Sequence, residues 1–170
     1  WLQNDLLPEA RARGISTATF EAAFSGVKPN LKLPDLVLPG ESAPRSAKQH
    51  QAEFRQPSAY FAHIDGVVSG GRARARAHAS TLAAIEHSFG VPRGIVLAIW
   101  GRESGFGRAE IPHGAFEVLG TKAFLATRKE MFRQEVLAAL EMVEKRGIRP
   151  EAMRSSWAGA MGQPQFMPAS

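Results

Sequence analysis

Apolar residues recur at helical spacing in two short segments near the start of the chain. Residues 1–13 contain the first set of apolar residues at this spacing, which predicts a helix, and Gly14 follows them as a C-terminal helix stop. Ser16 can cap a second helix that ends at Gly26. From residue 27 to about 56 the pattern is lost among regularly spaced prolines, which indicates an irregular connection over a surface. We expect residues 1–56 to form N-terminal helices and a Pro-rich connection that pack on the core.

Helical spacing returns after residue 56 and continues to Gly147. The predicted helices cover residues 57–65, closed by Gly66, then about 72–88, 92–103 and 127–146. The third would bury Ile95 and Ile99 and carry Glu103 at its end, and the fourth would begin with a capping box at residues 127–130. No segment alternates long enough to predict a strand. The predicted fold class is therefore mainly α, with residues 57–170 as the core.

Composition restricts the classes of function. The 170 residues are 44% hydrophobic and 22% charged, which is typical of a globular chain and excludes wholesale disorder. The formal net charge of +5 favours anionic partners such as nucleic acids, acidic lipids or acidic glycans. Because Arg72, Arg74 and Arg76 spread around a predicted helix without forming one stripe, we expect no nucleic-acid partner.

No cofactor or metal is predicted. The chain has no cysteine, its histidines lack ligand spacing, and no Asp pattern resembles a calcium loop. Gly105 and Gly107 are not followed by the third glycine of a dinucleotide-binding motif. No apolar run approaches the roughly 20 residues that cross a bilayer, so any membrane anchor would have to precede Trp1.

The first candidate site is the sequence ESGFG at residues 103–107. A predicted apolar helix ends with a carboxyl group at Glu103, and two glycines then turn the chain away. The helix C-terminus and the apolar neighbours Ile99 and Trp100 would both favour the neutral carboxyl group, as a general acid requires. The alternative is a solvated glutamate that merely ends a helix.

The second candidate site is the sequence SWAGAMGQPQFMP at residues 156–168. Its small residues allow a ligand to approach the backbone closely. Ser156, Gln163 and Gln165 offer hydrogen bonds, and Trp157 and Phe166 offer stacking faces, which together are typical of a sugar site. A structural loop between two core helices could have the same composition.

The two motifs together resemble those of the lytic murein transglycosylase B family, bacterial enzymes with a lysozyme-like catalytic core. The opening Trp1-Leu2 helix and the Gln51-x-Glu53-Phe54 segment extend the resemblance. Pro164 departs from it, because a small or hydroxyl residue is expected there. The family's catalytic domain continues beyond the second motif, so we expect the core to be truncated at its C-terminal side.

The resemblance assigns roles to individual residues. It implies that Glu103 is the catalytic acid/base and that the glycan cleft contains the substrate-binding residues Ser156, Gln165, Phe166, Met161, Arg128 and Lys129. Two cations in the first turn of a helix oppose its dipole, at about 0.3–1 kcal/mol each, which independently hints at a function for the last two. The alternative is that they are ordinary surface residues.

The resemblance also implies the reaction. A peptidoglycan lytic transglycosylase cleaves the β-1,4 bond between MurNAc and GlcNAc and leaves a 1,6-anhydroMurNAc end, with one carboxyl group and no attacking water. The nearest alternative carboxylates, Glu110 and Glu117, lack the apolar surroundings of a nucleophile. The implied partners are peptidoglycan strands with acidic stem peptides, in the bacterial periplasm or cell envelope. A muramidase that hydrolyses the same bond and a non-catalytic peptidoglycan-binding module remain alternatives.

Overall fold

The chain divides into two compact units. The computed structural model describes residues 1–42, 58, 61 and 64–170. Unit 1 combines Trp1–Arg45 with Ile111–Ser170, and unit 2 is Ser46–Glu110. These units do not coincide with the boundary predicted at residue 56, and the predicted domains stay a prediction.

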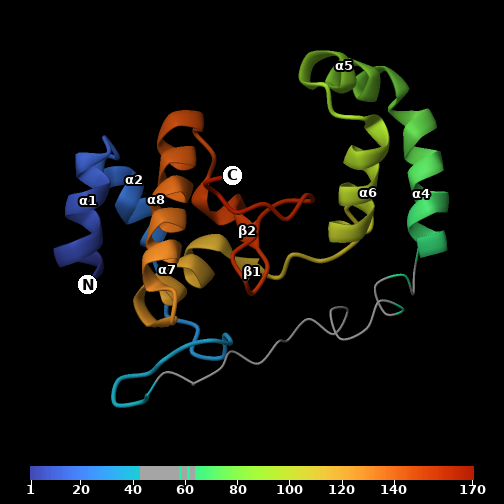
Figure 1. Ribbon diagram of the computed structural model, residues 1–170. Coiled ribbons are helices and arrows are strands. Elements are labelled where there is room, and N and C mark those ends of the chain that lie inside the picture. The colour runs from blue at the N-terminus through green and yellow to red at the C-terminus, as the bar shows by residue number, and fades with distance from the viewer. Residues whose placement is uncertain (43–57, 59–60, 62–63) are drawn as a thin grey trace. The chain divides into compact units, whose positions relative to one another are not determined.

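Unit 1 is built mainly from helices (Figure 1). Its elements are η1 (Leu2–Leu6), α1 (Leu7–Ala12), α2 (Thr17–Phe24), β1 (His113–Gly114), α7 (Ala115–Leu125), α8 (Lys129–Arg146), η3 (Pro150–Ala152) and β2 (Arg154–Ser155). The two short strands pair antiparallel, with His113 opposite Ser155. The mainly α fold class is confirmed, and so is the cap of α2, where the Ser16 hydroxyl accepts from the Thr19 N–H at 3.1 Å.

Helix α7 lies at the centre of unit 1, and it was not predicted from the sequence. It is buried around most of its circumference, with Phe124 44% exposed, and it packs chiefly against α8, with α2 also in contact. Phe116 and Leu119 of α7 share a core with Val136 and Leu140 of α8 and with Phe20 of α2. Because a helix buried around most of its circumference has no continuous polar face, its sequence lacks the amphipathic period by which helices are recognised.

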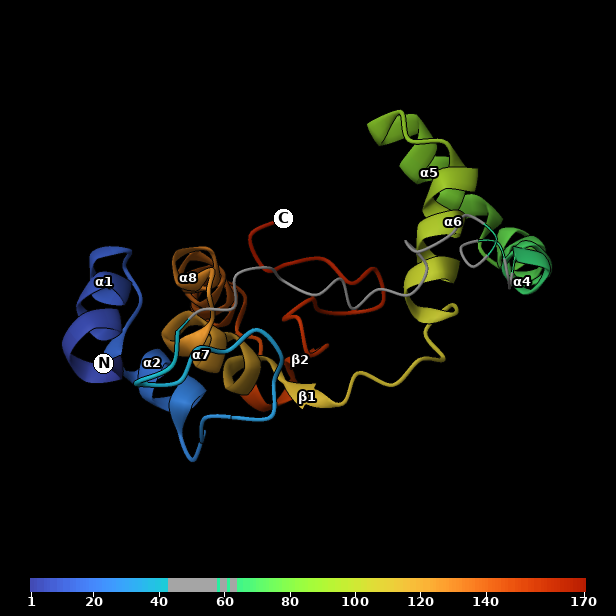
Figure 2. The same cartoon turned by 60° about the horizontal axis from the view of Figure 1, so that its bottom comes forward.

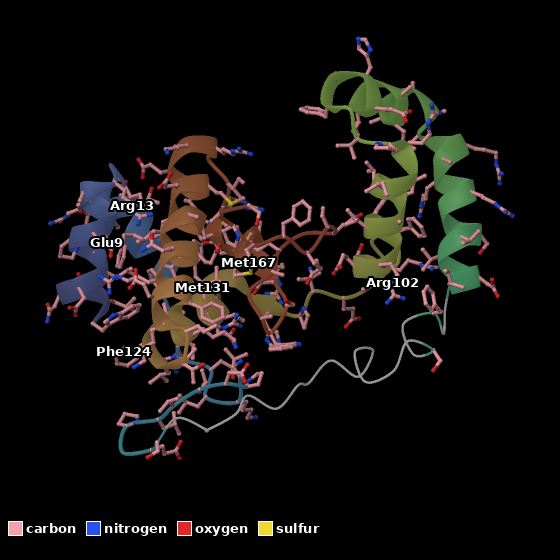
Figure 3. All side chains as sticks on the ribbon, viewed as in Figure 1. Glu9, Arg13, Arg102, Phe124, Met131 and Met167 are labelled. Carbon is pink, nitrogen blue, oxygen red and sulfur yellow. The ribbon has the colours of Figure 1, made fainter. Side chains whose placement is uncertain are left out.

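An ion pair and a hydrogen bond between side chains join the end of α1 to α8. Glu9 of α1 forms an ion pair with Arg13, at 3.3 Å (Figure 3), and a second with Arg133 of α8, at 2.5 Å. Arg13 also donates to the side chain of Gln134 on α8. The first helices of the chain are thereby tied to a helix more than one hundred residues later.

Residues 27–42 of the Pro-rich connection have irregular structure, as the sequence predicted, and they run along α7; residues 43–56 lie outside the described part. The Asn30 N–H donates to the Thr121 hydroxyl at 2.9 Å, and the Asn30 amide donates to Glu117 at 2.6 Å. Further along, the Val37 N–H donates to the Leu125 carbonyl at 2.7 Å. Side chains of α7 and its last carbonyl group, that of Leu125, thus form hydrogen bonds with a connection that has no regular partner strand.

Lys122 of α7 is a buried cation, only 1% exposed. Its ammonium donates to the Pro34 carbonyl at 3.0 Å and lies over the rings of Phe132, at 5.1 Å, and Trp157, at 5.4 Å. Burial lowers the pKa of this ammonium; Asp35 opposes the shift and Arg128 reinforces it.

The capping box predicted at the start of α8 is wrong. The helix begins at Lys129, and its N-cap is Arg128, which makes no side-chain capping hydrogen bond. Thr127 instead donates its N–H to the Asp35 carbonyl at 3.2 Å, beside a bridge between Leu36 and Ala126. This pairing with the Pro-rich connection holds Thr127 outside the helix. The predicted stop at Gly147 is confirmed, in the left-handed conformation.

Unit 2 contains α4 (Ile64–Ala77), α5 (Ala79–Phe89) and α6 (Arg93–Ser104) (Figure 2). The stop predicted at Gly66 is wrong because α4 continues through it, at the modest cost of a glycine inside a helix. The predicted helix over residues 72–88 is broken at His78, whose φ of −121° and ψ of 29° are not helical. The start of the predicted 57–65 helix, and Gln51, Glu53 and Phe54, lie outside the described residues.

Among the described residues, no single helix is long and apolar enough to cross a membrane. Only together are α5 and α6 long and apolar enough for such a span, and the chain bends by 114° between them.

Lys122 predicts how stability depends on pH. In the unfolded chain this lysine has its ordinary pKa of 10.5, and in the folded chain the pKa is lower. Between the two values the unfolded chain binds more protons, so the free energy of unfolding rises with pH in that window. Relative to Lys122→Met, we expect the wild type to gain stability as the pH approaches 10.5 in urea unfolding series. A stability difference that stays constant with pH would contradict the burial of a charged ammonium.

Candidate active site

Glu103 lies in the last turn of α6, just before a turn built from left-handed residues. Gly105, Phe106 and Gly107 follow with φ values of 57°, 62° and 81°. Glycine adopts this conformation without strain, but phenylalanine does not, so Phe106 must be held by its surroundings.

Ser104 fastens this turn to the helix. Its side chain is 2% exposed, donates to the Trp100 carbonyl at 3.2 Å and accepts from the Gly107 N–H at 3.0 Å. One hydroxyl therefore ties the helix end to the residue at which the turn is complete.

The ring of Phe106 anchors the turn between α4 and α6. It is 6% exposed and packs edge-on against Trp100, with ring centroids 5.5 Å apart. A Cβ on Gly70 of α4, or on Gly101 of α6, would lie 2.6 Å from a ring atom of Phe106. The two helices thus need glycine where the ring enters, and this fit offsets the strain at Phe106.

The side chain of Glu103 is exposed, which corrects the expectation that apolar neighbours bury it. The buried stripe of α6 runs through Leu97, Gly101 and Ser104. Ile95 and Ile99, predicted to be buried, share the face of Glu103 and are 53% and 39% exposed. The helix therefore presents the carboxyl group on its open face, beside two aliphatic side chains.

In unit 1, the second motif forms two linked turns after β2. The Ser156 N–H donates to the Ala160 carbonyl at 2.8 Å, and the Met161 N–H donates to the Phe166 carbonyl at 2.8 Å. Gln165 has a φ of 54°, and its side-chain amide donates to the Gly162 carbonyl at 2.8 Å. The loop of residues 155–166, here called the motif loop, therefore brings the predicted Ser156, Met161, Gln165 and Phe166 together.

Close backbone approach seats the motif loop on α7. A Cβ on Gly159 would lie 2.5 Å from Leu119, and the φ of Gly159 is 91°. Ser155, the last residue of β2, is fully buried, whereas the next residue, Ser156, is half-buried. The rings of Trp157 and Phe166 are 40% and 55% exposed.

Arg128 and Lys129 were predicted in the first turn of a helix; in the structure Arg128 is the N-cap of α8, Lys129 is its first residue, and both side chains are exposed. The guanidinium of Arg128 lies 5.7 Å from the ring centre of Phe132. Lys122 contacts the same ring and also Trp157, so Arg128 is linked to the motif loop through buried neighbours. Glu103 belongs to unit 2, and the six predicted substrate-binding residues belong to unit 1.

Sequence reasoning missed Lys122, and the signal for it was a single lysine within the apolar stretch of residues 115–126. Glu117, considered as a second carboxylate, is bonded to Asn30 and serves the connection. Within residues 1–42, 58, 61 and 64–170, no three His, Asp or Glu side chains gather as metal ligands.

Comparison with known proteins identifies the family. The model of the family described as "Transglycosylase SLT domain" matches residues 1–170. The chain belongs to this family. It is 36% identical, over 83 residues, to membrane-bound lytic murein transglycosylase B of Escherichia coli K12, covering 48% of this chain and 23% of that protein.

Two solved structures from Pseudomonas aeruginosa are similar over nearly the whole chain. SltB3, in complex with NAG-NAM-pentapeptide, matches with 29% identity and a TM-score of 0.76, covering 96% of this chain and 42% of that one. The soluble lytic transglycosylase SltB1 matches with 28% identity and a TM-score of 0.78, covering 99% and 54%. The lysozyme-like helical core is thereby confirmed, and this SLT-domain chain spans about half or less of these relatives.

The close fit of the Phe106 ring against Gly70 and Gly101 predicts different effects of substitution at two glycines of α6. Gly101→Ala would press a methyl group into Phe106 and Val67, and we expect it to lower the free energy of unfolding by about 1–3 kcal/mol. Gly94→Ala is the matched control, since nothing lies within 4 Å of its Cβ position, and it should be neutral or slightly stabilising. Chemical denaturation measures the free energy of unfolding of both variants, and equal changes would argue against a close fit of Phe106 at Gly101.

Proposed function

We propose that this SLT-domain chain carries the catalytic acid of a peptidoglycan lytic transglycosylase. The enzyme would cleave the β-1,4 bond between MurNAc and GlcNAc and form a 1,6-anhydroMurNAc end. The observation that carries the proposal is an exposed carboxyl group at the end of α6, just before the turn that Ser104 and Phe106 hold, in a chain whose residues 1–170 all match the family. Pseudomonas SltB3 has also been solved with NAG-anhNAM-pentapeptide, which carries such an anhydro sugar.

Glu103 has the central role in this mechanism. In its neutral form it donates its proton to the glycosidic oxygen as the bond from MurNAc C1 breaks. The N-acetyl carbonyl of MurNAc stabilises the positive charge at C1. The Glu103 carboxylate then takes the proton of the MurNAc 6-hydroxyl, whose oxygen bonds to C1. Attack within one sugar has a high effective molarity, so neither a second carboxylate nor a bound water is needed.

The motif loop would bind sugars of the glycan strand. Ser156 offers a half-buried hydroxyl, and Phe166 offers an exposed ring for stacking. The amide NH₂ of Gln165 is engaged with the Gly162 carbonyl, so a ligand would meet its amide oxygen. Met161 packs against the core beneath these residues and would act by shaping the loop.

Arg128 and Lys129 would meet the acidic stem peptides of the substrate. Both are exposed at a helix start, where a cation opposes the dipole and a ligand carboxylate would offset that cost. This substrate places the enzyme in the bacterial cell envelope, in contact with the periplasm.

Glu103→Gln tests the proposed acid. Glutamine keeps the shape but cannot donate a proton, so turnover of sacculi by the full-length enzyme should fall by at least about 100-fold. Glu110→Gln, another exposed glutamate of unit 2, is the matched control and should retain turnover.

Mass spectrometry of the released muropeptides distinguishes the remaining candidates. Transglycosylation gives anhydro ends, one water lighter than the reducing ends that a muramidase would give. More than about a tenth of wild-type turnover in Glu103→Gln would remove this residue from the mechanism. Sacculus binding without any cleavage by the wild type would favour a binding module.

Replacing Arg128 and Lys129 together with Gln tests the stem-peptide contact. We expect lower turnover of peptide-bearing glycans, little change on peptide-free strands, and a difference that shrinks as salt screens the charges. Lys145→Gln with Arg146→Gln, at the other end of α8, removes the same charge and should affect both substrates alike. An equal loss on both substrates in the first variant would remove Arg128 and Lys129 from the site.

A further inference from the structure

The ammonium of Lys122 joins three segments that are distant in sequence. It bonds to the Pro34 carbonyl of the connection at 3.0 Å, and it lies over Phe132 of α8 and Trp157 of the motif loop. Among the described residues, no carboxylate lies within ion-pair distance of it. A buried ammonium held by one carbonyl and two rings, with Asp35 acting on it only from beyond ion-pair distance, is a costly way to fill space, because an apolar side chain of the same length would need no desolvation. The cost indicates a role other than packing.

Trp157 is the contact of Lys122 that lies nearest the proposed ligand site. It follows Ser156 directly, within the turn closed by the hydrogen bond from the Gly159 N–H to the Ser156 carbonyl at 3.0 Å. With 40% of its surface exposed, the indole is held less by burial than a core ring would be. The ammonium on its ring supplies a directional contact in addition, of the cation–π kind.

The loop has a second anchor on the same face of α7. The Gly159 backbone lies so close to Leu119 that a Cβ would stand 2.5 Å from it. Leu119 and Lys122 are three residues apart, and residues at this spacing share a helix face. The two contacts therefore hold the loop at Trp157 and at Gly159: the Gly159 contact sets the distance of the loop from α7, and the Lys122 contact sets the direction of the indole.

We propose that Lys122 is a positioning residue, which holds the indole of Trp157 and thereby orients Ser156 toward the glycan. The proposal rests on the proposed function for the identity of the ligand. Its structural part, the control of Trp157 by Lys122, does not depend on that function.

The structural part is tested without substrate. In NMR spectra of the ¹⁵N-labelled full-length protein, the Trp157 indole signal is assigned by its loss in Trp157→Phe. Lys122→Met should shift and broaden this signal and increase exposure of the indole to a soluble quencher. Lys122→Arg, which keeps a cation, should restore most of the wild-type behaviour. An unchanged Trp157 signal in folded Lys122→Met would overturn the proposal.

The functional part is tested with defined muropeptides. Lys122→Met should raise KM by about 3- to 10-fold and change kcat less, since the loss of a cation–π contact weakens binding at the loop but leaves Glu103 intact. In a Trp157→Leu background the same substitution should change KM less than about twofold. If Lys122 only stabilised the fold, Lys122→Met would reduce the fraction of active enzyme and hence the apparent kcat, at an unchanged KM. That result would overturn the proposal. If the wild type cleaves no glycan, the proposed function fails while the NMR result still decides the structural part.

Discussion

A positive charge buried at the centre of unit 1 determines how its loops are arranged. Lys122 lies on a buried face of helix α7, and its ammonium must find its partners inside the protein. It finds a carbonyl in the Pro-rich connection and two aromatic faces, one on α8 and one on the motif loop. Desolvating an ammonium costs several kcal/mol unless such partners are supplied. The connection and the motif loop, which have little regular structure, are therefore held in place by the same atom.

In unit 2, the turn after α6 is held in place without a buried charge. There the anchor is the ring of Phe106, which enters between α4 and α6 because Gly70 and Gly101 leave room for it. The ring holds its own residue in a left-handed conformation, and Ser104 closes the turn with two hydrogen bonds. In both units a buried side chain, together with hydrogen bonds or close backbone packing, fixes a short segment without regular structure. Its other side chains are left available for a ligand.

Sequence reasoning succeeded where a local signal and the packing agree, and failed where packing alone decides. Ser16 and Gly147 carry the chemistry of a helix cap and a helix stop, and the structure uses both. Helix α7 was missed because it is buried around most of its circumference and has no continuous polar face. Thr127 looked like a cap, but pairing with Asp35 of the connection, which is distant in sequence, holds it outside α8. The same limit hid Lys122, whose partners come from three separate segments.

The fold accounts for most residues of the two motifs, and those it leaves over are informative. In the first motif, Ser104, Phe106 and the glycines build the turn, whereas Glu103 makes no hydrogen bond or ion pair with the described residues that would explain a carboxylate there. In the second, Gly159 seats the loop, Met161 packs on the core, and the exposed ring of Phe166 is left over. A glutamate at the negative end of a helix dipole is locally disfavoured, so its presence there is better explained by chemistry than by stability.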